Sequence, residues 1–180
     1  TKEMLADAGK SFEGQRVVIS GSGNVATYAN QKATQLGGKV IAMSDSNGYI
    51  VDENGIDYKV IKEIKEVKRA RIKTYLEYVP TAKYVEGSQG IWTVPCDIAL
   101  PCATQNELLL DDAKTLVANG CFAVAEGANM PTSLDATAYL QDHGILGEKT
   151  ILGHCIHVNT AEMEIIKETG TMVVNNPESN

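Results

Sequence analysis

Residues 16–26, with the sequence RVVISGSGNVA, decide the fold of this chain. The run RVVIS is short and apolar, as in a buried β-strand, and residues 24–36 have a helical pattern that two glycines end. Between strand and helix stands the pattern G-x-G-x-x-A, in which Gly21 permits a tight turn and Gly23 leaves room for a pyrophosphate. Ala26 is small enough for the helix to pack closely on the strand. The stretch therefore predicts a dinucleotide-binding turn, with an ordinary strand–turn–helix corner as the alternative.

The rest of the chain alternates short apolar runs with helix-period stretches, a pattern typical of βαβ units. Further strands are predicted at residues 39–43, 84–86, 96–100, 122–126, 150–156 and 171–174. Helices are predicted at residues 1–8, 57–78, 111–119, 134–143 and 161–169, and a turn or hairpin at 46–55. The helix at residues 1–8 looks truncated at its start, which suggests a chain cut from a longer one. We expect a Rossmann-like, doubly wound α/β fold, with a mostly parallel sheet and helices on both faces.

Composition excludes several classes of function. The 180 residues are 43% hydrophobic and 22% charged, which fits one domain with a proper core. The formal net charge of −7 argues against a nucleic-acid or membrane partner, and no signal peptide or membrane-spanning run is recognisable. Cys96, Cys102, Cys121 and Cys155 form no CxxC pair, so we interpret them as buried thiols of a cytoplasmic protein, with a metal site as the alternative.

The residues after the second predicted strand bear on the adenosine ribose. Ser44, Asp45 and Ser46 stand there, and an acidic residue about 20 positions beyond the first glycine commonly accepts the ribose 2′-hydroxyl of NAD. A carboxylate repels a 2′-phosphate, so Asp45 favours NAD over NADP. The two serine hydroxyls can donate to phosphate oxygens and favour the opposite assignment.

A basic segment in the predicted helix 57–78 also favours a 2′-phosphate. Lys65, Lys68 and Arg71 are spaced by three residues, so a continuous helix would carry all three on one face. Such a face could bind a phosphate. The alternative is a solvated helix, because Glu63 and Glu66 are interspersed among the basic residues.

Three stretches together resemble the cofactor domain of the hexameric NADP-dependent glutamate dehydrogenases. They are SGSGNVA at residues 20–26, PCATQNEL at 101–108 and AEGANMPT at 125–132, and the similarity extends over about residues 1–146. The Ser-Asp-Ser triplet and the basic helix are also similar to that family. The resemblance implies a dinucleotide-binding domain at residues 1–146, with NADP as the cofactor and NAD as the alternative.

The resemblance also assigns the cofactor contacts. Gly21, Ser22, Gly23, Asn24 and Val25 would hold the pyrophosphate. The ribose and its phosphate would lie among Ser44, Asp45, Ser46, Lys65, Lys68 and Arg71. The nicotinamide ribose would lie near Ala103, Thr104, Gln105 and Asn129. Position supports the last group, because ligands of open α/β sheets bind beyond the carboxyl ends of the strands. Loop residues that bond only the backbone are the alternative for Gln105 and Asn129.

The family's substrate domain, with its catalytic lysines and aspartate, precedes the cofactor domain and has no counterpart in this sequence. We therefore assign no catalytic residue and expect a dinucleotide-binding protein without glutamate dehydrogenase activity of its own. The rival hypothesis is a chimeric or designed folding scaffold that has lost its ligand. The parent enzymes are hexamers, so a homo-oligomer is compatible with the sequence.

Residues 147–180 resemble a different family. The segment around His154 and His157 and the ending NNPESN are similar to one strand–helix–strand piece of the metal-dependent amidohydrolases, over about 35 residues. His143 is the only other histidine, too few ligands for that family's zinc site, so we assign no metal and interpret the histidines as relics. A chimera is expected, whose βαβ tail extends the same sheet.

Overall fold

The computed structural model describes residues 1–145, 151–153, 163, 164, 167 and 172–174. Its main sheet has six strands in the order β4-β3-β2-β1-β5-β6. The strands are β1 (Arg16–Ile19), β2 (Lys39–Ser44), β3 (Gly48–Val51), β4 (Lys83–Glu86), β5 (Ile98–Leu100) and β6 (Ala123–Val124). The four strands β2, β1, β5 and β6 are parallel, and β3 and β4 continue the sheet antiparallel. The predicted α/β fold with a mostly parallel sheet is confirmed.

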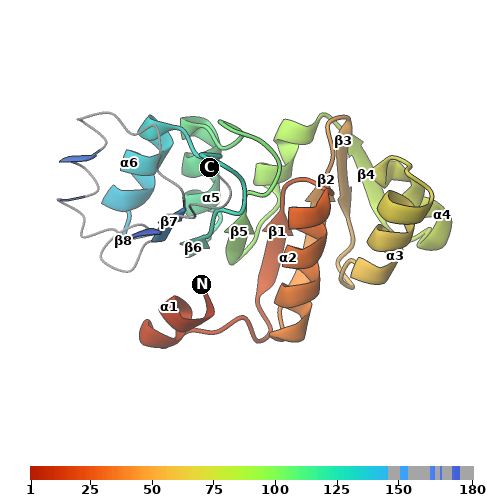
Figure 1. The fold of residues 1–180 in the computed structure, drawn as a ribbon, viewed down its shortest axis with the longest axis horizontal. Coiled ribbons are helices and arrows are strands. Elements are labelled where there is room, and N and C mark those ends of the chain that lie inside the picture. The colour runs from red at the N-terminus through yellow and green to blue at the C-terminus, as the bar shows by residue number, and fades with distance from the viewer. Residues whose placement is uncertain (146–150, 154–162, 165–166, 168–171, 175–180) are drawn as a thin grey trace.

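Helices cover both faces of this sheet. They are α1 (Lys2–Asp7), α2 (Asn24–Gln35), α3 (Tyr58–Lys62), η1 (Glu63–Val67), η2 (Ile72–Thr74), α4 (Tyr75–Tyr78), η3 (Ser88–Thr93), α5 (Leu110–Ala118) and α6 (Leu134–Asp142). Figure 1 shows the strands side by side, with α3 and α4 at one end of the row and α5 and α6 at the other. Val17 and Ile19 of β1 pack in one core cluster with α2 and α3, and Val18 packs in a second cluster with α5 and α6. Burial on both faces explains why the strands lack strict polar alternation.

The predicted hairpin at residues 46–55 is present as the antiparallel pair β2–β3. The Asp45 carboxylate closes its turn by accepting the N–H of Asn47 at 2.8 Å. Gly48 then meets β4 so closely that a Cβ there would clash with the carbonyl oxygen of Val85. Only glycine fits at this crossing, which fixes where the antiparallel strands begin.

The single helix predicted at residues 57–78 is wrong. The helix ends after η1, where Ala70 donates its N–H to the carbonyl of Ile64 at 2.9 Å, and Arg69 takes the left-handed conformation with φ +52°. This is the geometry of a helix C-terminus, at a position that glycine usually occupies. No glycine or proline marks the break, and its physical cause is burial: Ile72, just beyond it, is fully inside the core.

The remaining helices lie close to their predicted positions. Ser133 occupies the N-cap position of α6 as expected, but its hydroxyl bonds the Asp135 carboxylate and makes no capping bond. No helix among the described residues is long and apolar enough to cross a membrane.

The tail contributes β7 (Ile151–Gly153) and β8 (Met172–Val174), two of its predicted strands. They pair in parallel with each other as a two-stranded sheet of their own, so among the described residues they do not extend the main sheet as expected. The neighbouring edge strand, β6, has only two residues and therefore offers few ladder hydrogen bonds to a new strand. Met163, Glu164 and Lys167 are helical within the predicted helix 161–169, and His154 and His157 lie outside the described residues.

Candidate dinucleotide-binding site

The candidate site begins at the turn between β1 and α2. Gly21 has φ +83° and donates its N–H to the Ser44 hydroxyl at 2.8 Å, which ties the turn to the end of β2. A Cβ on Gly21 would lie 3.2 Å from Ala103, so this glycine is required by both conformation and space. Gly23 is different, because a Cβ there would meet nothing within 4 Å. The turn thus leaves open space directly before the first N–H groups of α2, a 12-residue helix.

The three polypeptide segments around this turn are joined by buried hydrogen bonds. The Ser20 hydroxyl accepts the N–H of Cys102 at 2.8 Å, and the N–H of Ser20 reaches the carbonyl of Leu100 at 3.2 Å. Burial raises the pKa of the Cys102 thiol to about 12, so this cysteine is a neutral packing group in the floor of the site. The ends of β1, β2 and β5 are therefore held together as one rim.

A cavity of about 460 Å³ opens above this rim. Four segments line it, namely the turn itself, the end of β2, helix η3 and the turn after β5. Eight of the fifteen predicted cofactor residues lie on its wall: Gly21, Ser22, Gly23, Ser44, Asp45, Ser46, Ala103 and Thr104. The spacing of these segments therefore brings together residues from three separate predicted motifs.

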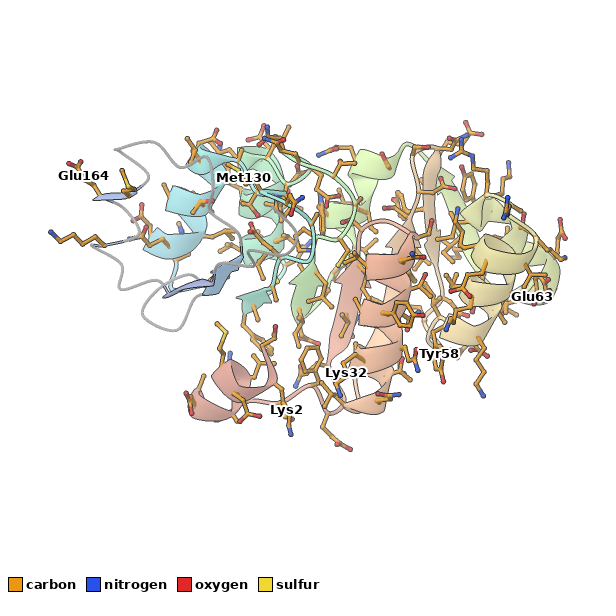
Figure 2. The ribbon with its side chains drawn as sticks, in the orientation of Figure 1. Lys2, Lys32, Tyr58, Glu63, Met130 and Glu164 are labelled. Carbon is orange, nitrogen blue, oxygen red and sulfur yellow. The ribbon has the colours of Figure 1, made fainter. Side chains whose placement is uncertain are left out.

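The other seven predicted residues lie outside this cavity wall. Asn24 and Val25 are exposed on the first turn of α2, and Gln105 and Asn129 are exposed in loops. Val25 faces a second cavity of about 350 Å³ between α1, α2 and the ends of β5 and β6. Lys2 and Lys32 line this second cavity, and Figure 2 shows them near each other below the sheet.

The three predicted basic residues do not share a helix face, because the chain breaks at Arg69. Lys65 folds over the break and donates to the carbonyl of Ala70 at 3.1 Å. The ammonium of Lys68 lies 4.6 Å from the centre of the Tyr78 ring, and a hydrogen bond with Tyr78 raises the pKa of Lys68. Arg71 alone reaches the end of β2, where its guanidinium donates to the Ser46 hydroxyl at 2.8 Å.

Asp45 holds this arrangement in place. One carboxylate oxygen accepts the N–H of Asn47, and the other accepts the N–H of Ile72 at 2.9 Å. Since Ile72 directly follows Arg71, the carboxylate fixes the segment that carries the guanidinium to the end of β2. The acidic residue, which in isolation favours NAD, is thus bonded to the backbone that presents a cation.

Eight lining residues of the cavity were not predicted from the sequence, and four of them bring polar side chains from outside the predicted motifs or order the site. Ser88, Gln89 and Trp92 come from η3, and Glu107 comes from the turn after β5. The Gln89 amide and the Trp92 indole both donate to the carbonyl of Glu107 at 3.0 Å. The sequence offered only a weak signal for the contribution of η3 to the site. This signal is a polar Ser-Gln pair between Gly87 and Gly90, in a stretch without helical periodicity.

The Glu107 side chain orders the turn after β5. Its carboxylate accepts the N–H of Ala103 at 2.9 Å and that of Thr104 at 3.3 Å. Burial raises the pKa of this carboxyl above its ordinary value, against the opposing effect of those N–H groups. Its backbone N–H also donates to the carbonyl of Pro131 at 2.7 Å, so Glu107 connects the second and third predicted motifs.

The sheet order and the glycine turn are those of a Rossmann-like α/β domain. Along residues 1–179 it matches the family model for the glutamate/leucine/phenylalanine/valine dehydrogenases, and the chain belongs to that family. The resemblance on which the sequence analysis relied is thereby confirmed at the level of the family.

Curated relatives match much of the chain. The NADP-specific glutamate dehydrogenase of Helicobacter pylori (strain ATCC 700392 / 26695) is 52% identical over 141 residues, covering 75% of this chain and 32% of that protein. The NADP-specific enzyme of Escherichia coli (strain K12) is 50% identical over 148 residues, covering 81% and 33%. The NAD(P)-specific enzyme of Xylanibacter ruminicola is 53% identical with the same coverage. This chain therefore spans about a third of the length of these curated relatives.

Solved structures agree with the fold. Plasmodium falciparum glutamate dehydrogenase superposes with a TM-score of 0.76 and 45% identity, over 80% of this chain and 31% of that chain. A glutamate dehydrogenase mutant, in which leucine replaces a lysine, superposes with a TM-score of 0.74 and 27% identity, over 98% of this chain and 40% of that chain. The latter match and the family model both extend into the tail, whereas the three curated relatives named above cover 75–81% of the chain.

Proposed function

We propose that this chain binds NADP(H) in the cavity of about 460 Å³, as the cofactor-binding domain of a glutamate dehydrogenase. One observation carries the proposal: the open space at Gly23 faces the first N–H groups of α2, and the same cavity extends to Ser46. A pyrophosphate fits the first place, because helix N-termini present unpaired N–H groups and a positive dipole end. A dinucleotide can therefore span from the turn to the end of β2.

The ribose end supports NADP over NAD. The Arg71 guanidinium and the Ser46 hydroxyl are already hydrogen-bonded to each other, and both are exposed donors suited to a phosphate. The Asp45 carboxylate accepts three backbone N–H groups, from Asn47, Gly48 and Ile72, which offsets its repulsion of a phosphate. Lys65 and Lys68 would complete the phosphate site after side-chain rotation. NAD stays the alternative cofactor, as one relative is NAD(P)-specific.

The nicotinamide end is assigned to the loops after β5 and β6. Asn106 donates its N–H to the carbonyl of Met130 at 3.0 Å, and both residues are left-handed, with φ of +52° and +47°. Strained backbone held by a neighbouring loop is typical of binding sites. In Figure 2 Met130 lies over α5, in the upper left of the view, and Glu63 lies at the opposite end of the molecule. We place the nicotinamide ribose beside the hydrogen bond between the backbones of Asn106 and Met130, within reach of Gln105 and Asn129.

We propose that this chain by itself binds the dinucleotide and does not catalyse glutamate oxidation, because hydride transfer also needs a bound substrate and a proton acceptor. A cytoplasmic location and assembly into a homo-oligomer remain predictions. The chimeric origin of residues 147–180 is also a prediction: the curated relatives named above match only 75–81% of the chain, whereas the family model extends to residue 179 and counts against it.

Calorimetric titration with NADP⁺, NAD⁺ and 2′,5′-ADP at low salt tests the binding proposal. We expect saturable binding of 2′,5′-ADP that weakens roughly tenfold in Arg71→Ala, since a charge-assisted phosphate contact is lost. Lys59→Ala is the matched control, because it removes one exposed positive charge from α3, outside the cavity, and should leave affinity unchanged. Absence of binding by all three ligands would overturn the proposal and favour a folding scaffold.

A further inference from the structure

Two cysteines face each other at the amino ends of strands β5 and β6, at the opposite end of the strands from the cofactor cavity. Cys96 stands two residues before Ile98, and Cys121 stands two residues before Ala123. Ile98 and Ala123 are paired in the parallel ladder, so the register carried back two residues sets Cys96 opposite Cys121. Neighbouring strands lie about 4.8 Å apart. That separation falls within the Cα–Cα range of about 4.4–6.8 Å that a disulfide spans.

The two side chains also point the same way. Both belong to the core cluster on the α5 and α6 side of the sheet, where Cys96 is 3% exposed and Cys121 4%. A hydrogen bond joins the two thiols, which raises the pKa of Cys96 and lowers that of Cys121. The Cys121 thiol also donates to the carbonyl of Ala123 at 3.3 Å.

We propose that Cys96 and Cys121 form a redox modification site, at which a small disulfide oxidant such as glutathione disulfide converts the thiol pair into an intrachain disulfide. The inference rests on strand register and shared burial and is independent of the proposed cofactor. It distinguishes these two residues from Cys102, whose thiol lies in the floor of the cofactor cavity.

The reaction proceeds by two thiol–disulfide exchanges. The Cys121 thiolate attacks one sulfur of glutathione disulfide, forms a mixed disulfide and releases one glutathione thiolate, which takes up a proton. The Cys96 sulfur, losing its proton to solvent, then attacks Cys121 Sγ and releases the second glutathione. The protein pair loses two electrons and two protons, and glutathione disulfide is reduced to two glutathione molecules.

Access to the pair requires a local opening of the sheet edge. Cys121 follows Asn119 and Gly120, both exposed, and precedes β6, which has only two residues. Short edge strands open at lower free energy than central strands. The disulfide would close a loop from residue 96 to 121 at the amino ends of β5 and β6, whereas the cofactor cavity is lined by residues that follow the carboxyl end of β5.

The test is incubation of the folded protein with glutathione disulfide at pH 8, followed by mass spectrometry of unreduced peptides. We expect a linked Cys96–Cys121 peptide with the mass of two hydrogens lost. The temperature of unfolding should rise by about 5–10 °C and return after dithiothreitol, because the cross-link restricts the unfolded chain. The affinity for 2′,5′-ADP should not change.

Single variants identify the sulfurs involved. Cys96→Val and Cys121→Val should each abolish the thermal shift, while Cys102→Ser and Cys155→Ser should retain it. The wild-type peptide map decides the matter even where a variant folds poorly. Three outcomes would overturn the proposal. The first is glutathione attached to Cys121 without a link to Cys96, and the second is a disulfide to another cysteine. The third is that both thiols stay free even when mild urea has opened this part of the sheet.

Discussion

The two ends of the proposed cofactor cavity are built in opposite ways. The glycine turn lies within one continuous stretch, with Gly21 between a strand buried at Val17, Val18 and Ile19 and a helix packed through Ala26. The ribose end is assembled from the end of β2 and a segment 25 residues away, joined by the hydrogen bonds of Ser46 with Arg71 and of Asp45 with Ile72. The first is fixed by local geometry and core packing. The second depends on a few polar contacts at a half-exposed surface.

This difference implies different sensitivities to substitution. A change at Gly21 must move backbone that is packed against Ala103 and the carbonyl of Cys102, so it affects folding and binding together. A change at the ribose end loses hydrogen bonds that partly exchange with water, so it should affect binding more selectively.

Gly21→Val should have the largest effect. A valine would have to adopt φ near +83° with its Cβ 3.2 Å from Ala103, so we expect the free energy of unfolding to fall by about 2–4 kcal/mol. Urea denaturation measures this loss. Gly23→Ala is the matched contrast, because its Cβ meets open space and φ is −76°. That variant should keep its stability yet bind 2′,5′-ADP about tenfold more weakly, because the methyl group occupies the phosphate approach. If both variants lost the same unfolding free energy, the prediction that only Gly21 is required for packing would be contradicted.

Asp45→Ala should have an intermediate effect and decides how the acidic residue acts. Removing the carboxylate leaves the N–H groups of Asn47, Gly48 and Ile72 without their acceptor, so we expect a loss of about 1–3 kcal/mol in unfolding free energy. Affinity for 2′,5′-ADP, measured by calorimetry, should fall several-fold as Arg71 loses its anchor. Asp142→Ala, at the end of α6, controls for the change in net charge. Tighter binding of 2′,5′-ADP by Asp45→Ala would instead mean that the carboxylate acts mainly by repulsion.

Glu107→Gln should have the smallest effect, visible only as a pH dependence. Burial raises the folded pKa of this carboxyl above the ordinary 4.5, so the neutral form is favoured in the folded state. Its contribution to stability is therefore complete below pH 4.5 and is lost as pH rises through the folded pKa. Glutamine keeps the acceptor for Ala103 without the charge, so the wild type should become less stable than the variant as pH rises. We expect a difference below about 1 kcal/mol, since solvent screens this partly exposed carboxyl. Urea denaturation from pH 4 to pH 8 measures it, and a difference that shrinks with rising pH would contradict the assignment.

The same contrast explains what sequence could predict. The turn at Gly21 and Gly23 was predictable because strand, glycines and helix are contiguous, and the parallel sheet followed from apolar runs separated by helices. The break at Arg69 was not, because left-handed arginine carries no sequence signal and is held there by burial of Ile72. With the break missed, Lys65, Lys68 and Arg71 were placed together on a face that does not exist.

Two further features depend on tertiary contacts. Ser88, Gln89 and Trp92 reach the cavity through a short 3₁₀ helix whose position is set by bonds to the Glu107 carbonyl, 15 or more residues away. The sequence also did not reveal that Asp45 joins the hairpin turn to the segment that carries Arg71, because it shows a carboxylate but not the N–H groups that donate hydrogen bonds to it. Site residues could thus be predicted where they lie within one continuous motif, whereas their hydrogen-bond partners from distant segments could not.

The two edge strands of the main sheet, β4 and β6, differ in the charge that they carry. At one edge, β4 carries Lys83 and Glu86 as exposed charges, which discourage a foreign strand from adding to it. At the other, Ala123 and Val124 of β6 bring no charge, and within the described residues this strand has a ladder partner on one side only. A strand added beside β6 would therefore meet no charged side chain of that strand, but the two residues of β6 would give it few backbone hydrogen bonds, so the shortness of β6 limits growth of the sheet where charge does not.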